Sequence, residues 1–283
     1  MLFDLSHRAK FRITGNDRVR FLNGQLTNDI NQLHPGNAIH ACALTAKGRL
    51  CADLFVAMTT DAFYVDAELT LAPQLLNRLE RYIIADEVSI EQVDFGLFHV
   101  LGNDAPELEG SHHFASQRFR KAGTDYWFPP QLESSVRERF KKPPVSPAEA
   151  EFYRIQCGIP KWGAELSEEV IPVEAGLDAT AISYTKGCYL GQEVISRIKS
   201  IGHVNRHLRA LRVPEDLRFS PGDILIGSDK KKAGFITSVL PEGFSSEIGA
   251  LGYVRRGFDE PGSVLQVQRG NNVVGSVTVI YPN

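Results

Sequence analysis

The chain has 283 residues, of which 43% are hydrophobic and 23% charged, and its formal net charge is −3 at pH 7. These values are typical of a globular protein and exclude a mainly disordered chain, a collagen and a disulfide-stapled miniprotein. The slightly acidic balance also excludes a global basic field for nucleic acid. The sequence contains no run of eighteen apolar residues and no basic start followed by a long apolar stretch, so we expect no membrane span and no secretory signal.

The first half of the chain predicts interleaved strands and helices. In chain order, the expected elements are a strand at 11–15, a helix capped by Asn16 or Asp17, strands at 42–45 and 50–58 around a turn at 46–49, a strand at 62–66, a helix at 69–84 and a strand at 88–93. Strands joined by a short glycine-containing turn form an antiparallel hairpin. Because helices alternate with such hairpins, we predict the α+β class.

The middle of the chain predicts less regular structure, with two helices beyond it. Residues 101–125 are rich in Gly, Asp, Ser and His and are expected to be a variable surface connection. A helix is predicted from Pro147 to Cys157, because Ser146 and Glu149 have the spacing of a capping box. A second helix is predicted at 192–198, where apolar residues recur on one face.

The last part of the chain reads as a small all-β domain. Short β-rich runs recur at 208–213, 222–226, 233–239, 249–254, 264–268 and 274–280. Gly, Pro and Asn turns separate them every eight to fifteen residues, which is typical of a small barrel or sandwich. We therefore expect a domain boundary near residues 203–208.

The segment Lys186-Gly-Cys-Tyr-Leu-Gly-Gln-Glu193 is the richest in chemistry. It places Cys188 in a loop just before a predicted helix N-terminus and two residues after a lysine, and both features favour the thiolate. Cys188 is therefore the candidate reactive or metal-binding sulfur. The alternative is that Cys188 is a small buried hydrophobe, which is how we interpret Cys42, Cys51 and Cys157. The four widely spaced cysteines indicate a cytoplasmic protein with reduced thiols.

Two other features remain open on the residues alone. Glu174 lies among apolar residues, where a carboxylate needs a partner, such as the adjacent N–H donors of an aminopyrimidine ring. The alternative is a solvated carboxylate. Residues 186–212 carry six Lys or Arg against Glu193, a patch for an anionic tail, phosphate or RNA, or simply solvated side chains. His203 or His207 in this stretch is an alternative partner for Cys188 in a nucleophilic pair.

The signature 186–193 resembles the K-G-C-Y-x-G-Q-E motif of the YgfZ-type folate-binding proteins, relatives of the glycine-cleavage T-protein, an aminomethyltransferase. Companion motifs follow in the expected order, and the resemblance spans most of residues 10–210. The companion motifs are Phe21-Leu-Asn-Gly-Gln-Leu-Thr-Asn-Asp29, Ala46-Lys-Gly-Arg49, Gly158-Ile-Pro160, Ile171-Pro-Val-Glu-Ala-Gly-Leu177 and Gly202-His-Val-Asn-Arg206.

The resemblance implies a three-lobed ring. Residues 1–203 would form a folate-binding region of two interlaced α+β lobes, roughly 1–45 with 146–203, and 46–145. Residues 204–283 would form a C-terminal β-barrel that closes the ring, and the protein is expected to be a monomer.

The resemblance also implies a function. The family supports assembly or repair of iron–sulfur enzymes in a tetrahydrofolate-dependent way, with tRNA modification affected indirectly. The implied partners are folate and iron–sulfur assembly factors or client enzymes, with no membrane and no direct nucleic acid. Cys188, which would hold a transient cluster with ligands from a partner, and Lys186 are the implied functional residues. The implied folate contacts are Glu174, Asn28, Gly187, Gln192, Glu193 and Arg206.

One departure bears on the alternative function, a folate-dependent aminomethyl transferase. The T-protein carries an Asp-Asp pair just after the turn that corresponds to 46–49, and here the matching residues are Ala52 and Asp53. Asp53 is thus the one candidate catalytic carboxylate. A third hypothesis, an RNA-binding module, uses the basic patch and is opposed by the acidic overall balance.

Overall fold

The computed structural model describes residues 1–102, 106–141 and 143–281. The chain divides into two compact units. Unit 1 comprises Met1–Val145 and Asp178–Ser196, and unit 2 comprises Ser146–Leu177 and Arg197–Asn283. The lobes, the ring and the domain limits expected from the sequence stay predictions.

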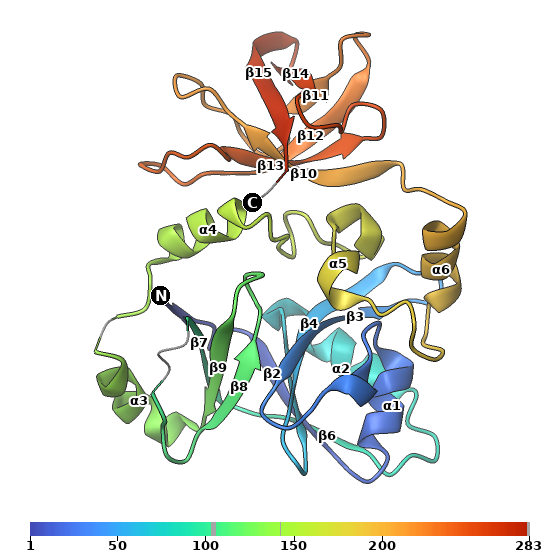
Figure 1. Ribbon diagram of the computed structural model, residues 1–283, viewed down its shortest axis with the longest axis vertical. Helices are drawn as coiled ribbons and strands as arrows, with labels where there is room; N and C mark the ends of the chain where they lie inside the picture. The colour runs from blue at the N-terminus through green and yellow to red at the C-terminus, as the bar shows by residue number, and fades with distance from the viewer. Residues whose placement is uncertain (103–105, 142, 282–283) are drawn as a thin grey trace. The chain divides into compact units, whose positions relative to one another are not determined.

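Unit 1 contains two antiparallel sheets (Figure 1). The five-stranded sheet has the order β3-β4-β5-β2-β6 and the four-stranded sheet the order β1-β7-β9-β8. In chain order the strands are β1 (Leu2–Asp4), β2 (Ala9–Thr14), β3 (Ala38–Leu44), β4 (Leu50–Met58), β5 (Phe63–Ala67), β6 (Ser89–Gln92), β7 (Gly96–Leu101), β8 (His112–Ser116) and β9 (Gly123–Phe128). The predicted hairpin around the 46–49 turn is confirmed as β3 and β4.

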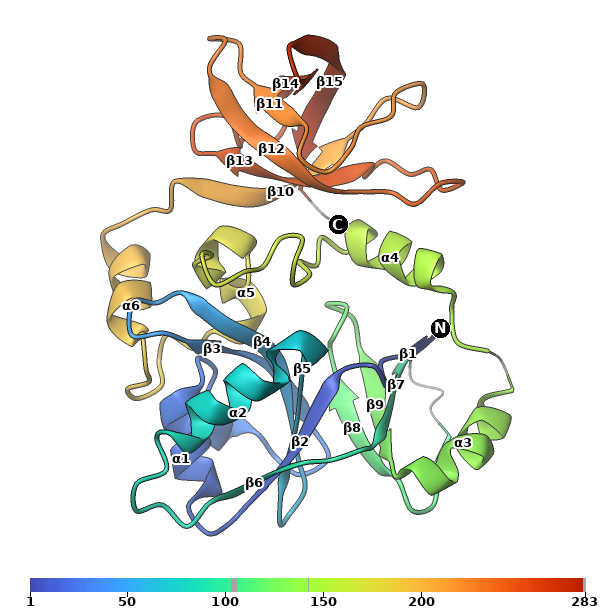
Figure 2. The same ribbon diagram turned by 180° about the vertical axis from the view of Figure 1, so that it is seen from behind.

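The helices of unit 1 lie beside these sheets. They are α1 (Arg18–Gln25), α2 (Ala72–Glu80), α3 (Glu133–Phe140) and α5 (Asp178–Ala181), with 3₁₀ turns η1 (Ile30–Gln32), η2 (Leu69–Leu71) and η3 (Pro130–Leu132). Helix α6 (Gln192–Ser200) begins in unit 1 and confirms the helix predicted at 192–198. Helix α5 contacts β3, and both views show the two side by side (Figures 1 and 2).

Two predictions about unit 1 are wrong. The expected surface connection at 101–125 contains β8 and the start of β9, and its residues 103–105 lie outside the described ranges. The polar composition of this stretch predicted a loop, but Phe114 within it is buried and packs in one cluster with Trp127. The helix expected at 69–84 starts as the 3₁₀ turn η2 and ends at Glu80, with Ile84 90% exposed beyond it.

Unit 2 contains α4 (Pro147–Gln156), the 3₁₀ turn η4 (Pro172–Ala175) and six strands. The predicted capping box at the start of α4 is confirmed, because Ser146 Oγ accepts from the Glu149 N–H while the Glu149 carboxylate accepts from the Ser146 N–H. The strands are β10 (Arg206–Arg212), β11 (Ile224–Ile226), β12 (Lys232–Val239), β13 (Ala250–Arg255), β14 (Val264–Arg269) and β15 (Asn272–Ile280).

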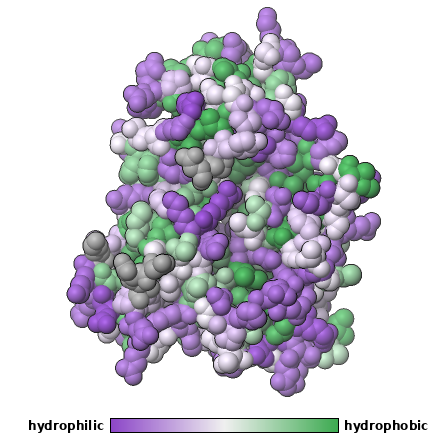
Figure 3. Space-filling view, viewed as in Figure 1, coloured by the Kyte–Doolittle hydropathy of each residue, from purple (hydrophilic) through white to green (hydrophobic). Residues whose placement is uncertain are grey.

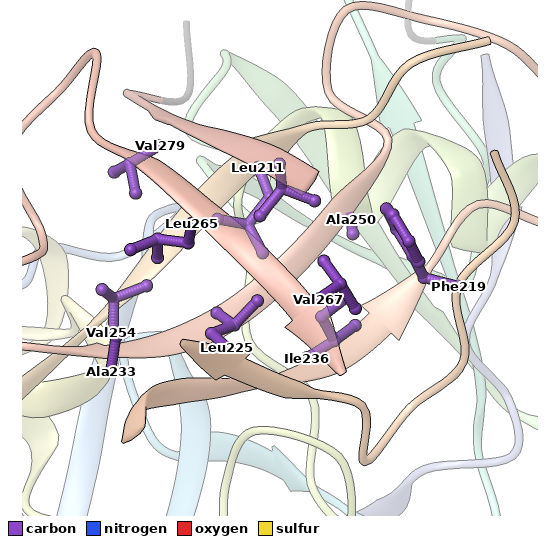
Figure 4. Close-up of a cluster of buried hydrophobic side chains, with 11 residues drawn as sticks. Leu211, Phe219, Leu225, Ala233, Ile236, Ala250, Val254, Leu265, Val267 and Val279 are labelled. Atoms are coloured by element: carbon purple, nitrogen blue, oxygen red, sulfur yellow. The ribbon is translucent and has the colours of Figure 1, made fainter. Parts of the chain in front are cut away.

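These six strands pair in the closed order β10-β13-β12-β11-β14-β15. Alternate side chains of the strands point inward and form an apolar core, drawn in Figure 4. The predicted mixture of helices and antiparallel strands is thus confirmed for the chain.

Figure 3 shows hydrophilic residues over most of the visible face, with apolar residues scattered among them. Within the described residues, no helix is long and apolar enough to cross a membrane.

Candidate functional site

The signature loop lies in unit 1, between α5 and α6. Cys188 and Gly187 are exposed, whereas Lys186 and Tyr189 on either side are buried. The alternative of a buried, inert Cys188 is therefore wrong. The loop presents its thiol to solvent while burying Lys186 and Tyr189, which is the arrangement that a reactive or metal-binding sulfur needs.

The ammonium group of Lys186 is held by three backbone carbonyl oxygens. Its Nζ donates to the oxygens of Asn23 at 2.6 Å, Leu26 at 2.8 Å and Asn28 at 2.8 Å. An ammonium has three hydrogens, so these acceptors satisfy all of them. Burial lowers the pKa of Lys186 to about 8, with Asp29 acting in the opposite direction. The segment that receives these bonds, 23–28, lies in the N-terminal motif 21–29.

The turn at 46–49 packs directly against the end of the signature. Gly191 has φ +89°, and a Cβ on it would lie 2.5 Å from the Thr45 carbonyl oxygen. Gly48, with φ +72°, would bring a Cβ to 2.8 Å from Cβ of Val194 in α6. Only glycine meets both the conformation and the close approach. Three motifs that are far apart in the sequence therefore meet around the Cys188 loop.

Gln192 and Glu193 form the first turn of α6, directly after this contact. Gln192 is half-buried and its N–H donates to the Tyr189 carbonyl oxygen at 3.2 Å. Glu193 is exposed. Both lie within a few residues of Cys188, at the N-terminal end of α6, where Glu193 suits the positive end of the helix dipole.

The Thr-Asn pair of the 21–29 motif joins strand β3 to the segment around α5. Thr27 Oγ1 donates to the Ala181 carbonyl oxygen at 2.6 Å and accepts from the Cys42 N–H at 2.8 Å. Asn28 Nδ2 donates to the carbonyl oxygens of His40 at 2.8 Å and Thr180 at 3.1 Å. The side-chain amide of Asn28 thus donates to two backbone oxygens and holds strand β3 close to the segment around α5.

Asp53, the candidate carboxylate, has partners that the sequence analysis missed. His40 Nε2 is hydrogen-bonded to Asp53 Oδ1, and His40 Nδ1 lies 2.8 Å from Thr180 Oγ1. The His40 ring also stacks on Phe55 at 4.6 Å between centroids. A hydroxyl, an imidazole and a carboxylate thus form a chain able to move a proton. The signal that was available is strand register: β3 begins at Ala38, before the predicted strand 42–45, and it pairs Cys42 with Asp53 and His40 with Phe55, so that His40 lies diagonally across from Asp53.

Glu174 and Arg206 lie in unit 2, on η4 and β10, and they contact each other. Arg206 Nη2 donates to Glu174 Oε2 at 3.0 Å, and the guanidinium lies 4.4 Å from the centroid of the Tyr253 ring. The side chains are 12% exposed for Glu174 and 29% for Arg206. The partner that a half-buried carboxylate requires is therefore Arg206.

Most of the predicted basic patch is neutralised. Lys186 is buried, and acidic partners pair with the arginines of β10: Glu174 with Arg206, Asp259 with Arg209 and Glu247 with Arg212. His207 Nδ1 also lies 2.7 Å from Asp259 Oδ2. These contacts weaken the hypothesis of RNA binding, because paired cations release fewer counterions.

The other cysteines are less accessible. Cys42 and Cys157 are buried, as predicted, and Cys51 is half-buried beside the guanidinium of Arg78. Burial raises the pKa of the Cys42 thiol well above its ordinary value, and the carboxylate of Asp53 adds to this effect. Within the described residues, no group of three His, Cys, Asp or Glu is placed to hold a metal ion.

Comparison with known proteins places this geometry in context. Residues 1–112 match the GCVT N-terminal domain family. The "tRNA-modifying protein YgfZ" of Yersinia pestis is 27% identical over 268 residues, which cover 84% of this chain and 80% of that protein. The "Iron-sulfur cluster assembly factor IBA57 homolog, mitochondrial" of Phaeosphaeria nodorum is 26% identical over 227 residues, covering 74% of this chain and 54% of that protein.

Among solved structures, the glycine cleavage system aminomethyltransferase T from Bartonella henselae has a TM-score of 0.84 at 18% identity. The matched region covers 98% of this chain and 84% of that chain. That likeness shows a common fold. The resemblance predicted from the signature residues is therefore confirmed: residues 1–112 match the GCVT N-terminal domain family, the chain is similar to YgfZ and IBA57 proteins, and it has the fold of the glycine-cleavage T-protein.

Proposed function

We propose that this protein is a cytoplasmic, tetrahydrofolate-binding accessory factor that supports the assembly or repair of iron–sulfur cluster enzymes. tRNA modification would depend on it indirectly, through modifying enzymes that carry such clusters. The observation that carries the proposal is an exposed thiol, Cys188, on a loop in which Lys186 and Tyr189 are buried and Lys186 and Gly191 are anchored. The names of the YgfZ and IBA57 relatives agree with it.

In this proposal Cys188 works as a thiolate that binds, transfers or protects the iron or sulfur of a client's cluster, which is cargo. A cluster of the common types takes four protein ligands, which are mostly cysteines. Among the described residues, no group of three His, Cys, Asp or Glu is placed to hold a metal ion. The remaining ligands therefore come from the client or an assembly factor, so this protein holds a cluster only while that partner is bound.

The Glu174–Arg206 pair fits the chemistry of a folate. A carboxylate accepts two parallel N–H donors, which is what the aminopyrimidine edge of a pterin offers, and a guanidinium donates to a carbonyl or carboxylate oxygen. Both side chains are partly exposed and bind each other, and Glu174 Oε2 also accepts from the Ile171 N–H at 3.5 Å. A ligand would exchange one of these bonds for its own. Asn28, Gly187, Gln192 and Glu193 stay predicted folate contacts.

Titration with tetrahydrofolate tests the folate part. We expect Glu174→Ala to weaken binding at least tenfold, because a hydrogen bond to a charged group is worth roughly 1.5–3 kcal/mol. Cys188→Ala should bind like the unchanged protein. Glu247→Ala is a matched control, since Glu247 also pairs with an arginine of β10 but is well exposed. Absence of binding by the unchanged protein would refute folate as a ligand.

Complementation of a strain that lacks its own copy of the protein tests the thiol part. Cys188→Ser should fail to restore the activity of iron–sulfur enzymes, although it keeps the fold and the folate titration of the unchanged protein. Full restoration by Cys188→Ser would exclude a role for the thiol, whatever the outcome with folate.

Aminomethyl transfer is the second candidate function, and Asp53 favours it. Its carboxylate is partly exposed and belongs to the Thr180–His40–Asp53 chain, which can take up or release a proton. The purified protein should then form or consume methylene-tetrahydrofolate with an aminomethyl donor, and Asp53→Asn should abolish this turnover. No turnover by the unchanged protein removes the candidate.

A further inference from the structure

Helix α1 ends without a basic residue of its own. The last carbonyl groups of a helix have no partner within the helix and need donors from elsewhere. In α1 the Leu22 oxygen accepts from the Leu26 N–H, which closes the last turn. The oxygens of Asn23, Gly24 and Gln25 remain, and segments far away in the sequence supply their donors.

The signature loop supplies two of these three donors. Lys186 Nζ donates to the Asn23 oxygen and the Leu190 N–H donates to the Gly24 oxygen at 3.2 Å. Arg78 of α2 supplies the third, because its Nη2 lies 3.2 Å from the Gln25 oxygen. Lys186 also binds the oxygens of Leu26 and Asn28 just beyond the helix. The carbonyl groups at this end are thus satisfied by cations and an N–H from outside α1.

The signature loop is therefore fixed to the C-terminal end of α1 on both sides of Cys188. Lys186 holds the chain two residues before the thiol and Leu190 holds it two residues after. Beyond Leu190, Gly191 rests on the backbone of the 45–48 turn. The positive charge of Lys186 is directed at the negative end of the α1 dipole, where a cation is stabilising.

We propose that Lys186 is a positioning residue that caps α1 and thereby fixes the Cys188 loop, in place of acting on the thiol by its charge. This inference deepens the proposed function, since it rests on Cys188 being the working thiol. Its test uses neither folate nor a cluster enzyme, so its failure and the failure of the proposed function are distinguishable.

The experiment measures two properties of full-length protein carrying Lys186→Met, Lys186→Arg or Lys231→Met. The first is backbone amide hydrogen exchange in peptides that cover 23–28 and 186–192. The second is the rate of alkylation of Cys188 by iodoacetamide against pH, followed on the Cys188 peptide by mass spectrometry. Lys231→Met is the matched control, because it makes the same change at a side chain that is 80% exposed.

A positioning role predicts that exchange rises at least tenfold in both segments for Lys186→Met and Lys186→Arg alike. Arginine keeps the charge, but its planar guanidinium cannot occupy the place of a compact ammonium between three oxygens. The plateau rate of alkylation should change several-fold while its pH midpoint stays the same. Lys231→Met should change neither property.

The opposite pattern would overturn the proposal. If Lys186 activates the thiol by its charge, Lys186→Met raises the pH midpoint of alkylation by a unit or more, Lys186→Arg restores it, and exchange is unaltered in both. If Lys186→Met does not fold, Lys186→Arg decides alone: unaltered exchange contradicts the capping role and local acceleration supports it.

Discussion

The two regions that carry the proposed function are built in opposite ways. In unit 1, the Cys188 loop is anchored by the buried ammonium group of Lys186, which donates all its hydrogens to backbone oxygens. Gly191 and Gly48 allow the end of the loop and the start of α6 to pack against the 45–48 turn. In unit 2, Glu174 and Arg206 are two partly exposed side chains that bind each other. The first arrangement fixes a reactive atom in place. The second can exchange partners, which is what recognition of a polar ligand requires.

Ion pairs elsewhere in the chain repeat this contrast. Arg118 is buried between two buried carboxylates, with Nε 2.8 Å from Asp125 Oδ1 and Nη1 3.1 Å from Asp66 Oδ1. Its guanidinium also lies over the Phe55 ring, which stacks on His40. A buried charge that loses its partner is costly, whereas an exposed pair contributes little. Burial therefore separates the ionic groups that hold the fold from those free to act.

The largest expected effect is that of Arg118→Met. It leaves the carboxylates of Asp66 and Asp125 buried with fewer partners and should lower the free energy of unfolding by about 3–5 kcal/mol. Urea denaturation measures it. A loss of unfolding free energy below about 1 kcal/mol would mean that this buried cluster contributes no more to stability than an exposed ion pair.

The same cluster is expected to govern the stability in acid. Burial alone would raise the pKa of Asp66 and Asp125. Arg118 beside both carboxylates, helped by Arg8 at Asp66 and by His99 at Asp125, nevertheless holds each pKa below the ordinary value of 3.8. A lowered pKa means that the unfolded chain binds protons first, so stability is fully present above about pH 4 and falls as the pH drops further.

Unfolding free energies measured from pH 5 to pH 2.5 check this expectation. Asp125→Asn keeps the shape of the side chain but cannot ionise, and it should be less stable at pH 5 and show a shallower decline. An equally steep decline in Asp125→Asn would assign the acid sensitivity to other carboxylates.

A smaller effect is expected within the signature loop. Gly191→Ala places a Cβ 2.5 Å from the Thr45 oxygen at a positive φ and should cost roughly 2–3 kcal/mol. Gly187→Ala is the matched control four residues earlier, where a Cβ meets nothing within 4 Å, and should cost less than about 0.5 kcal/mol. Thermal denaturation of both variants gives the comparison. Equal stabilities would mean that the loop is not held at Gly191.

The smallest effect is expected for Arg206→Met. Its pair with Glu174 is partly exposed, so the loss of unfolding free energy should stay under about 1 kcal/mol while tetrahydrofolate binding weakens measurably. Denaturation and ligand titration on one preparation separate the two. A large loss of stability with unaltered binding would make this pair structural, like that of Arg118.

Much of the local structure followed from the sequence. The capping box at Ser146, the β3–β4 hairpin and helix α6 are short-range patterns, set by side chains within a few residues of each other. Strand β8 was missed because its polar residues outweighed the apolar alternation around Phe114. For the site, residue types identified Cys188 and Glu174, but not His40 or Thr180, whose meeting with Asp53 depends on strand register and on where α5 lies.

The sequence by itself determined the candidate residues, because a thiol between glycines and a carboxylate among apolar residues are recognisable without coordinates. The tertiary structure decided what their neighbours do. Lys186 reads as an activator of Cys188 at a separation of two residues, yet its ammonium binds oxygens more than 150 residues away along the chain. The physical reason is that helix α1 ends with unpaired carbonyl groups, and only folding brings the donors that satisfy them.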